Sequence, residues 1–422
     1  MNRLKGLRII VLILIMFFVG YYFGTQKISL EWKNYKPILS IANNQPPPGV
    51  NVDFVNFWTV WQDVENKYYD KTKIDPQKML NGAITGMIGT LEDPYTVYLP
   101  PVNNTNFKQG MAGEFHGIGA ELGLKENKIV VVSPLSESPA IKAGVKPEDV
   151  ILKVDGTSTQ GWSIAQAVEK IRGPKGTLVT LNIQHKNEKS PKDIRITRDV
   201  ITVKSIDGDV KKIKDVANIK ISDKLKSSQD DEIMYLRLTQ FGDHTNKDWN
   251  ELMTRLSLKV TANKKFKGII LDLRNNPGGY LTDAAFISAE FIKQGEPVVI
   301  QETGTGAKTT LTADRHGLFL TQPLIILINK GSASASEIVS GAMRDYKRAK
   351  LVGETSFGKG TIQQSEDLGG GAGVHITIAK WLTPKGNWVH GKGLEPDVKV
   401  ALDSKDPTRD TQLEKAIEEL VK

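Results

Sequence analysis

The chain has 422 residues, an ordinary globular composition and a formal net charge of +8. That length is enough for roughly two to four domains with a large core, and the basic residues are spread along the chain, so no nucleic-acid partner is expected. The sequence contains no cysteine, which excludes disulfides, thiolate catalysis and cysteine-ligated metals.

The amino end predicts a membrane segment. Three basic residues within the first eight positions precede an apolar run at residues 9–23, which is typical of a signal peptide or a signal anchor. No Ala-x-Ala cleavage site follows, and Tyr21 and Tyr22 suit a membrane interface, so we interpret residues 1–24 as an uncleaved anchor and transmembrane helix. The run is shorter than the roughly 20 residues of a full span, and a cleaved signal peptide is the alternative. The positive flank predicts that the rest of the chain lies on the extracytoplasmic side of the cell membrane, as a single-pass protein.

Residues 25–50 are predicted to be a linker, because three consecutive prolines before Gly49 stop regular structure. Residues 51–104 are predicted to be a helical segment. Apolar and aromatic side chains recur with helical spacing over residues 55–68 and again over residues 79–91. We expect these aromatic side chains to pack in a core.

Between residues 105 and 203 the pattern changes to short strands with few helices. A glycine turn, Gly117-Ile118-Gly119, enters an alternating strand, and an amphipathic helix follows at residues 162–171. This order resembles a PDZ domain in the circularly permuted form of bacterial proteases; a glycine hairpin in an unrelated β domain is the alternative. The resemblance implies that Gly117, Ile118 and Gly119 offer backbone N–H groups to the carboxylate of a peptide tail, which binds as an added strand.

Residues 204–400 alternate strands with helices, which indicates an α/β layer, and residues 401–422 end in an amphipathic helix. An apolar run at residues 323–328 is typical of a strand buried on both faces, and helical spacing resumes at Glu337. Three serines lie in the turn between them. Because free N–H groups collect at a helix N-terminus, such a serine is either a helix cap or a nucleophile beside an anion-binding site.

The sequence lacks the complete motifs of three classes of enzyme: P-loop nucleotide hydrolases, Ser-His-Asp hydrolases and zinc peptidases. Residues 353–360 match a nucleotide-binding P-loop as far as its lysine, but the magnesium-binding Ser or Thr is replaced by Gly360. Gly-x-Ser-x-Gly and His-Glu-x-x-His are absent, so neither a Ser-His-Asp hydrolase nor a zinc peptidase is expected. We predict no metal and no cofactor, and we interpret His316, His375 and His390 as ordinary loop or strand residues.

Lys359 is a candidate base, because it lies between two glycines. A serine nucleophile needs a proton acceptor, and an unperturbed lysine, with a pKa of about 10.4, is charged at neutral pH. Burial without a carboxylate partner would lower that pKa, and Phe357 and Ile362 are compatible with an apolar pocket. An exposed loop lysine is the alternative.

Three longer motifs occur in a fixed order: Asp-Leu-Arg-Asn-Asn-Pro-Gly-Gly at 272–279, Gly-Ser-Ala-Ser-Ala-Ser-Glu at 331–337 and Phe-Gly-Lys-Gly-Thr-Ile-Gln at 357–363. Together with Leu-Glu-Asp-Pro-Tyr-Thr-Val-Tyr at 91–98 and Gly-Lys-Gly-Leu-Glu-Pro-Asp-Val at 391–398, they resemble the signatures of the C-terminal processing peptidases, or tail-specific proteases. The resemblance covers residue 55 to about residue 400. It implies an α/β multidomain protein with an anchor, a helical segment, a PDZ domain and a peptidase core.

The resemblance also implies the site residues. The middle serine of the run, Ser334, is the nucleophile, and the base follows 25 positions later (359 − 334 = 25), which is Lys359. The orienting glutamine is Gln363, with the adjacent Gln364 as an alternative. The oxyanion donors are the backbone N–H groups of Ala335 and of Gly278 or Gly279. Ser332 and Ser336 keep a capping or structural role.

The function implied is that of a membrane-anchored, extracytoplasmic serine endopeptidase. Its PDZ domain would bind protein or peptide substrates by their free C-termini, and Ser334, Lys359 and Gln363 would cleave them. Its other partners would be the cytoplasmic membrane, through residues 9–23, and a second copy of the chain in a homodimer or higher oligomer. The alternative is a membrane-tethered PDZ adaptor whose peptidase-like domain is not catalytic.

Overall fold

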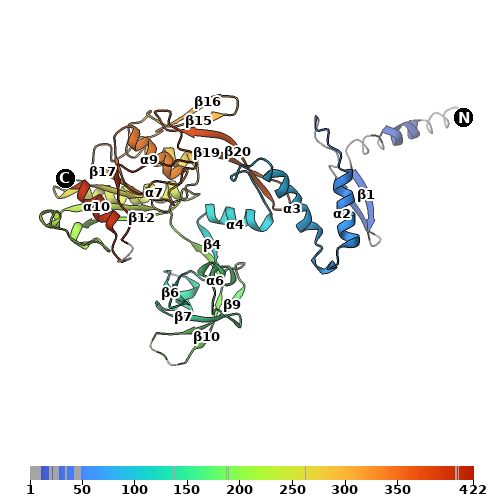
Figure 1. The fold of residues 1–422 in the computed structure, drawn as a ribbon, viewed down its shortest axis with the longest axis horizontal. Coiled ribbons are helices and arrows are strands. Elements are labelled where there is room, and N and C mark those ends of the chain that lie inside the picture. The colour runs from blue at the N-terminus through green and yellow to red at the C-terminus, as the bar shows by residue number, and fades with distance from the viewer. Residues whose placement is uncertain are drawn as a thin grey trace, which may run out of the picture. The chain divides into compact units, whose positions relative to one another are not determined.

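A computed structural model describes residues 11–18, 21, 28–33, 36–41, 49–135, 138–186, 188, 190–261, 263–403, 406 and 408–422. The chain divides into two compact units, Met1–Leu80 and Asn81–Lys422. Figure 1 traces the chain from blue at the N-terminus to red at the C-terminus. The candidate site lies wholly within the second unit.

The first unit contains two strands that the sequence interpretation did not expect. β1 (Ile28–Lys33) pairs antiparallel with β2 (Lys36–Ile41), inside the segment 25–50 that was predicted to be a linker. That prediction is wrong for these residues, because apolar and polar residues alternate from Ile28 to Trp32 with the period of a strand. The proline run that suggested the linker lies outside the described residues.

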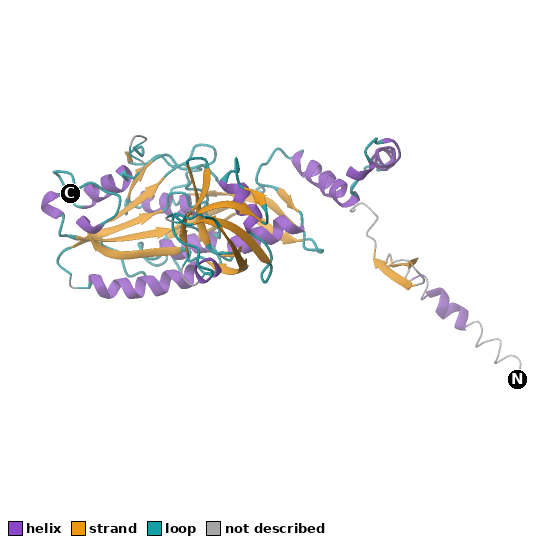
Figure 2. Ribbon diagram, turned by 90° about the horizontal axis from the view of Figure 1, so that it is seen from below, coloured by secondary structure: helices purple, strands orange, loops and turns teal. Residues whose placement is uncertain are grey.

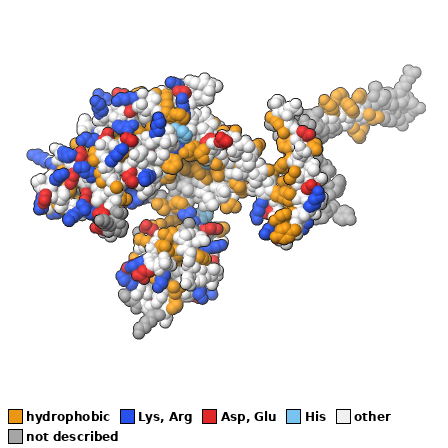
Figure 3. Space-filling model, in the orientation of Figure 1, with side chains coloured by type: hydrophobic (Ala, Val, Ile, Leu, Met, Phe, Trp, Pro, Cys, Tyr) orange, Lys and Arg blue, Asp and Glu red, His pale blue; other side chains and the backbone are white. Residues whose placement is uncertain are grey.

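The predicted helices of the first unit are confirmed, but their packing is not. α2 (Val55–Lys67) and the short η1 (Lys71–Lys73) precede α3 (Pro76–Gly89), which continues into the second unit. No residue of α2 is buried, and Trp58 is 57% exposed. Figure 3 shows apolar side chains along the surface of this unit. The expected core packing of these aromatic side chains is therefore wrong, because the hydrophobic clusters of the described residues include none of them.

The predicted signal anchor falls mostly outside the described residues. Within the apolar run, residues 11–18 are helical. Over the part of the chain that is described, no helix has both the length and the apolar character needed to cross a membrane. The anchor therefore stays a prediction.

The domain predicted to be a PDZ forms a mixed β and helical structure of its own. Its sheet has the order β10-β9-β7-β6-β5, so β5 is an edge strand, and Ile118 is buried in its core. A separate two-stranded ladder, β4 with β11, connects this domain to the rest of the chain. Its elements are β4 (Glu114–Gly117), β5 (Ala120–Lys125), β6 (Lys128–Pro134), α5 (Pro139–Lys142), β7 (Val150–Val154), β8 (Thr157–Ser158), α6 (Ile164–Ile171), β9 (Leu178–Gln184), β10 (Lys192–Thr197) and β11 (Asp199–Thr202).

The domain predicted to be a peptidase core is built on a six-stranded sheet of order β12-β13-β14-β17-β18-β21, in which all pairs except β12 with β13 are parallel. The predicted α/β layer is confirmed. Its strands and helices are β12 (Ile206–Lys212), η2 (Ile213–Asp215), η3 (Lys226–Ser228), β13 (Glu232–Leu238), α7 (Thr245–Val260), β14 (Phe266–Asp272), α8 (Leu281–Ser288), β17 (Leu324–Ile328), α9 (Ala335–Asp345), β18 (Lys350–Gly353), β21 (Val398–Lys399) and α10 (Thr411–Leu420).

β17 is buried along its whole length, as its apolar run predicted. Ile326 and Ile328 pack in the cluster that includes side chains of α7, α8 and α9. The alternate residues, Ile325 and Leu327, pack in the cluster that includes α10. Helices therefore cover both faces of the sheet, as Figure 2 shows, and the turn after β17 lies at the edge where parallel strands end.

A second, antiparallel sheet of order β16-β15-β20-β19 completes the core, with β3 paired to β20. Its strands are β15 (Pro297–Thr303), β16 (Lys308–Thr312), β19 (Thr361–Asp367), β20 (Gly373–Leu382) and β3 (Val97–Leu99). The predicted boundary after residue 104 falls inside α4 (Pro101–Met111). Within the segment predicted to be helical, residues 97–99 instead form a strand that pairs with β20.

Candidate active site

Ser334 lies at the turn from β17 into α9, where the chain adopts a strained conformation. Its φ is +54°, a region that costs a residue other than glycine about 1–3 kcal/mol. The side chain is half-buried, and the Ser334 N–H donates to Glu337 Oε2 at 2.9 Å. Ala335 is the first residue of α9, so its N–H is among those that have no acceptor within the helix. Strain at a helix N-terminus supports a nucleophile rather than a simple cap.

The two flanking serines have structural roles, as predicted. Both are fully buried. Ser332 Oγ donates to the carbonyl of Leu273 at 2.8 Å, and Ser336 Oγ donates to the carbonyl of Asn276 at 3.0 Å. Each hydroxyl therefore fastens the nucleophile turn to the chain just after β14, where the Pro-Gly-Gly turn begins.

The Pro-Gly-Gly turn packs directly against the nucleophile turn. A Cβ on Gly278 would lie 2.9 Å from Ala335 N, and one on Gly279 would lie 1.7 Å from the carbonyl oxygen of Phe241, so both positions require glycine. The Gly278 N–H already donates to Asn276 Oδ1 at 2.9 Å. Gly278 is therefore excluded as an oxyanion donor in this structure, and Gly279 stays the candidate beside Ala335.

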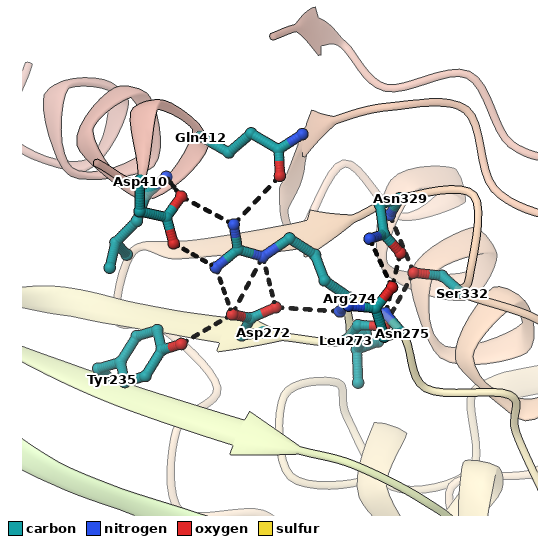
Figure 4. Close-up of polar contacts among 10 residues, drawn as sticks. Tyr235, Asp272, Leu273, Arg274, Asn275, Asn329, Ser332, Asp410 and Gln412 are labelled. Atoms are coloured by element: carbon teal, nitrogen blue, oxygen red, sulfur yellow. Dashed lines mark hydrogen bonds and ion pairs between the residues drawn. The ribbon is translucent and has the colours of Figure 1, made fainter. Parts of the chain in front are cut away.

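An ion-pair network holds the strand end that leads into this turn (Figure 4). Arg274 Nη2 bonds Asp272 and Asp410, each at 2.7 Å, and Arg274 Nη1 donates to Gln412 at 3.1 Å. Although burial disfavours the charge of Arg274, its bonds to the two carboxylates outweigh that effect and raise its pKa. The network links α10 to the start of the Pro-Gly-Gly turn, which keeps the turn from shifting.

Glu337 joins the nucleophile turn to the loop that carries Lys359, and the sequence interpretation missed it. This fully buried carboxylate accepts hydrogen bonds from Ser356 Oγ at 2.6 Å and Gly358 N at 2.7 Å through Oε1. Through Oε2 it accepts from Lys359 N and Ser334 N, both at 2.9 Å. The only signal in the sequence was its place in the first turn of the helix, three residues after the serine.

The lysine side chain is half-buried, which favours its neutral form. Burial lowers the pKa of Lys359, and the nearby Asp93 carboxylate opposes that effect. Lys359 Nζ lies 5.0 Å from the centre of the Tyr95 ring. The predicted lowering is confirmed in direction. Of the two apolar residues expected in the pocket, Ile362 lines the same cleft as Lys359, but Phe357 is 56% exposed, and a carboxylate is present. A strand, not a helix, follows the lysine, which excludes the P-loop geometry.

One cleft of about 480 Å³ brings the predicted catalytic residues together. Ser334, Lys359, Gln363 and the Gly278–Gly279 turn all line it. No hydrogen bond joins Ser334 Oγ, Lys359 Nζ and the Gln363 amide within the described residues; the amide donates instead to the hydroxyls of Thr361 and Thr377. Apolar side chains form much of the remaining wall, namely Phe107, Met111, Leu281, Ile338, Ile362 and Trp381.

His375, interpreted from sequence as ordinary, also lines the cleft. Burial and the Lys359 charge lower its pKa, and its ring packs edge-on against Phe107 with centres 4.4 Å apart. A neutral imidazole beside an apolar wall extends the surface that a substrate side chain would contact.

The predicted tail-binding turn is part of the PDZ fold. Gly117 ends β4, Ile118 is 3% exposed, and Gly119 has a φ of +71°. A Cβ on Gly119 would lie 2.5 Å from the Cβ of Ser138, so only glycine fits. The turn leads into the edge strand β5, which α6 contacts. An unpaired strand edge beside a helix is the arrangement that accepts a peptide as an added strand.

Asn246 of α7 and Asp283 of α8 form a hydrogen-bonded pair of side chains. Asp283, in the first turn of α8, accepts from Asn246 Nδ2 at 3.0 Å through Oδ1. Asp283 Oδ2 and Asn246 Oδ1 are both buried and have no partner among the described residues. Burial and the nearby Asp243 raise the pKa of Asp283 to about 6. A proton on Oδ2 would pair with Asn246 Oδ1 and satisfy both atoms.

We expect Asp283→Asn to stabilise the protein at pH 8 and to remove part of its pH dependence. The folded pKa lies above the ordinary 3.8, so the wild type gains stability as pH falls through 6, reaches the full gain below about 4, and loses it as pH rises again. A shift of about two units corresponds to about 3 kcal/mol. Urea unfolding at pH 5 and pH 8 measures the effect; identical pH dependence in both proteins would contradict it.

Comparison with known families matches three parts of the chain. Residues 232–400 match the family described as "Peptidase family S41", and residues 130–185 match "PDZ domain". Residues 16–101 match "Activating protease CtpB N-terminal domain". The PDZ and peptidase matches fall on the two folded parts that carry the predicted tail-binding and catalytic residues.

Individual proteins are similar over most of the chain. "Carboxy-terminal processing protease CtpB" of Bacillus subtilis is 37% identical over 341 residues, which cover 80% of this chain and 65% of that protein. "Carboxy-terminal processing protease CtpA" of the same organism is 37% identical, with 81% and 68% covered. The chain thus spans about two thirds of the length of these relatives. Among solved structures, "Photosystem II D1 C-terminal processing protease" is 27% identical with a TM-score of 0.50, covering 88% of this chain and 98% of that one.

Proposed function

The chain belongs to peptidase family S41 and is a serine-type peptidase with a PDZ domain, and we propose that it is an endopeptidase that recognises exposed C-terminal tails and cleaves by a Ser–Lys mechanism. One observation carries this proposal. Ser334 occupies a strained turn at a helix N-terminus, and a single buried carboxylate, Glu337, binds both the Ser334 N–H and the Lys359 N–H above the same cleft.

In this mechanism Ser334 Oγ attacks the carbonyl carbon of the scissile peptide bond while the neutral Lys359 amine takes its proton. The N–H groups of Ala335 and Gly279 stabilise the negative charge that develops on the carbonyl oxygen. Lys359 returns the proton to the leaving amine, and water then hydrolyses the acyl-enzyme. Burial of Lys359 supports this step because it lowers the free-energy cost of the neutral form.

Gln363 orients Lys359 in this proposal. Its amide lies in the cleft but donates to Thr361 and Thr377, each at 3.0 Å. A rotation of the side chain would bring the amide oxygen toward the lysine. Gln364, the alternative, is exposed and donates to Glu366, so it is not proposed for this role.

In this proposal the PDZ domain binds the C-terminal tail of the substrate. We place the bound tail along the edge strand β5, with its carboxylate at the Gly117–Gly119 turn and its apolar side chains against α6. Ile164 of α6 is 39% exposed although it is a large apolar residue, which supports an apolar docking surface there. The apolar wall of the catalytic cleft supports apolar residues at the cleavage point as well.

We expect Ile164→Glu to weaken recognition of tails without impairing chemistry. The introduced charge would be desolvated by an apolar tail, so KM for a substrate with a free apolar C-terminus should rise about tenfold, equivalent to about 1.4 kcal/mol. The kcat should stay within about twofold. Leu178→Glu is the matched control, because Leu178 is 60% exposed on β9, away from β5.

The same substrate with an amidated C-terminus tests the assignment from the other side. With the amidated substrate, the wild-type enzyme should lose most of the advantage in KM that a free C-terminus gives. The Ile164→Glu substitution should raise KM little further on this substrate. If Ile164→Glu lowered activity equally on the free-acid and the amidated substrate, that result would contradict recognition of the C-terminal tail by the PDZ domain.

Membrane anchoring through residues 9–23, an extracytoplasmic catalytic domain and self-association are also proposed. The basic flank followed by an apolar run supports the first two. Self-association is supported by the exposed aromatic surface of α2, where Trp58 and Phe57 are in edge-on contact with ring centres 5.0 Å apart. Fractionation of cells, protease accessibility of intact spheroplasts and sedimentation of the soluble fragment test these three in turn.

A further inference from the structure

We propose that Tyr95 and Asp93 are positioning residues that hold the Lys359 amine and set how readily it takes the proton of Ser334. The inference rests on the proposed Ser–Lys function. Tyr95 and Asp93 precede β3, more than two hundred residues before the lysine and on the other side of the PDZ domain in the chain. These two residues lie in the motif at residues 91–98, for which the family resemblance implied no role.

The contact between the amine and the ring is the first observation. Lys359 Nζ lies 5.0 Å from the centre of the Tyr95 ring, within the range of a cation–π interaction. Tyr95 is half-buried and also meets the ring of His390 edge-on. His390 Nδ1 lies 3.3 Å from Gly360 N, next to the lysine. The ring is therefore packed onto the lysine loop from two directions.

A turn centred on Asp93 fixes the ring in place. Asp93 Oδ1 accepts from Tyr95 N at 3.1 Å, and Asp93 Oδ2 accepts from Thr96 Oγ1 at 2.7 Å. Thr96 Oγ1 in turn accepts from Thr377 N at 3.0 Å on β20. Because Thr377 also binds the amide of Gln363, one strand holds both the tyrosine turn and the proposed orienting glutamine.

Asp93 is the carboxylate that acts on the lysine charge. Burial lowers the pKa of Lys359, and Asp93 opposes that effect. The other carboxylate in contact with the loop, Glu337, has both oxygens engaged by N–H groups and by the Ser356 hydroxyl. His375 also lines the cleft beside the lysine, and its own pKa is lowered by burial and by the Lys359 charge. Asp93 and the Tyr95 ring thus favour the ammonium, while burial favours the amine.

This balance has a consequence that a purely structural role would not have. A lysine base works only when neutral, so groups that favour the ammonium restrain the enzyme at low pH. Removing the Asp93 charge, or the face of the Tyr95 ring, should increase the neutral fraction. Either change should then extend activity toward lower pH rather than reduce it.

The test is the pH profile of kcat/KM for a tail peptide. We expect Asp93→Asn and Tyr95→Leu each to move the acid limb about 0.5–1 pH unit lower, a gain of about three- to tenfold on that limb. Asparagine can still form the turn, and Tyr95→Phe keeps the ring face, so Tyr95→Phe should keep the wild-type limb. Tyr98→Leu, in the strand β3 that follows Tyr95, is the control, since the Tyr98 hydroxyl binds Asn81.

A second readout does not depend on turnover. The pKa of Lys359, followed by NMR of protein carrying ¹³C-labelled lysine and assigned with Lys359→Ala, should fall in Asp93→Asn. An unmoved acid limb, or an unmoved Lys359 resonance titration, would overturn the inference. Cleavage by Ser334→Ala at the wild-type rate would instead overturn the proposed function. The two failures are therefore distinguishable.

Discussion

Ser334→Ala is expected to lose peptide cleavage by at least about 10⁴-fold in kcat/KM, the scale on which nucleophile removal acts in serine peptidases. The reason is chemical rather than structural. The Ser334 backbone N–H, not its hydroxyl, makes the bond to Glu337, so the turn should persist in the variant. Initial rates with a fluorogenic tail peptide measure the loss. The free energy of unfolding, measured by thermal unfolding, should change by only about 1 kcal/mol.

Ser340→Ala provides the matched control for this experiment. Ser340 lies in α9, the helix that begins directly after Ser334, is fully buried, and donates from Oγ to the carbonyl of Ser336 at 2.8 Å. It should lose about 1 kcal/mol of stability and keep its kcat/KM within about twofold. Residual cleavage by Ser334→Ala near the level of Ser340→Ala would contradict the assignment of the nucleophile.

Lys359→Ala is expected to lower kcat by about 10³-fold or more, because the proposed mechanism gives the Ser334 proton to the Lys359 amine. His375 also lines the cleft, but the contact of its ring is with Phe107. Lys359→Arg should be as inactive as Lys359→Ala, since a guanidinium stays charged. Lys392→Ala, an exposed lysine on the neighbouring loop, is the control and should retain full activity.

A small primary amine offers a stricter test of the same step. If Lys359 acts as a base, then methylamine above its pKa should restore part of the activity of Lys359→Ala and none of the activity of Ser334→Ala. Absence of any rescue together with normal folding would favour a structural role for the lysine.

The strand, turn and helix around Ser334 could be predicted because their signals are local: the apolar run of β17 and the small residues of the turn. The assignment of Ser334 and Lys359 came from the resemblance to the C-terminal processing peptidases and stays a prediction. The structural roles of Ser332 and Ser336 agree with their predicted places before the bend and inside the first helical turn. The α/β order of the core was equally readable, because β14 and β17 are buried on both faces.

What could not be predicted depends on contacts between distant segments. Glu337 was indistinguishable from an ordinary helix N-terminal glutamate until the lysine loop was found on its other side. The Gly278 N–H was a reasonable oxyanion donor until the Asn276 side chain was found to occupy it. Tyr95 reaches the lysine only because β3 joins β20 across the PDZ insertion. The aromatic side chains of α2 were wrongly predicted to pack in a core. Helical periodicity shows that a helix is amphipathic, but it does not show what covers the apolar face.

Covalent labelling by an active-site serine reagent tests the central claim most directly, because it separates a peptidase from a PDZ adaptor with an idle domain. Intact mass after treatment of wild-type protein with a fluorophosphonate should increase by one reagent, and peptide mapping should place it on Ser334. Labelling should be absent in Ser334→Ala and strongly slowed in Lys359→Ala. Tail-peptide binding by a protein that never labels, or a label on any other serine, would contradict the account.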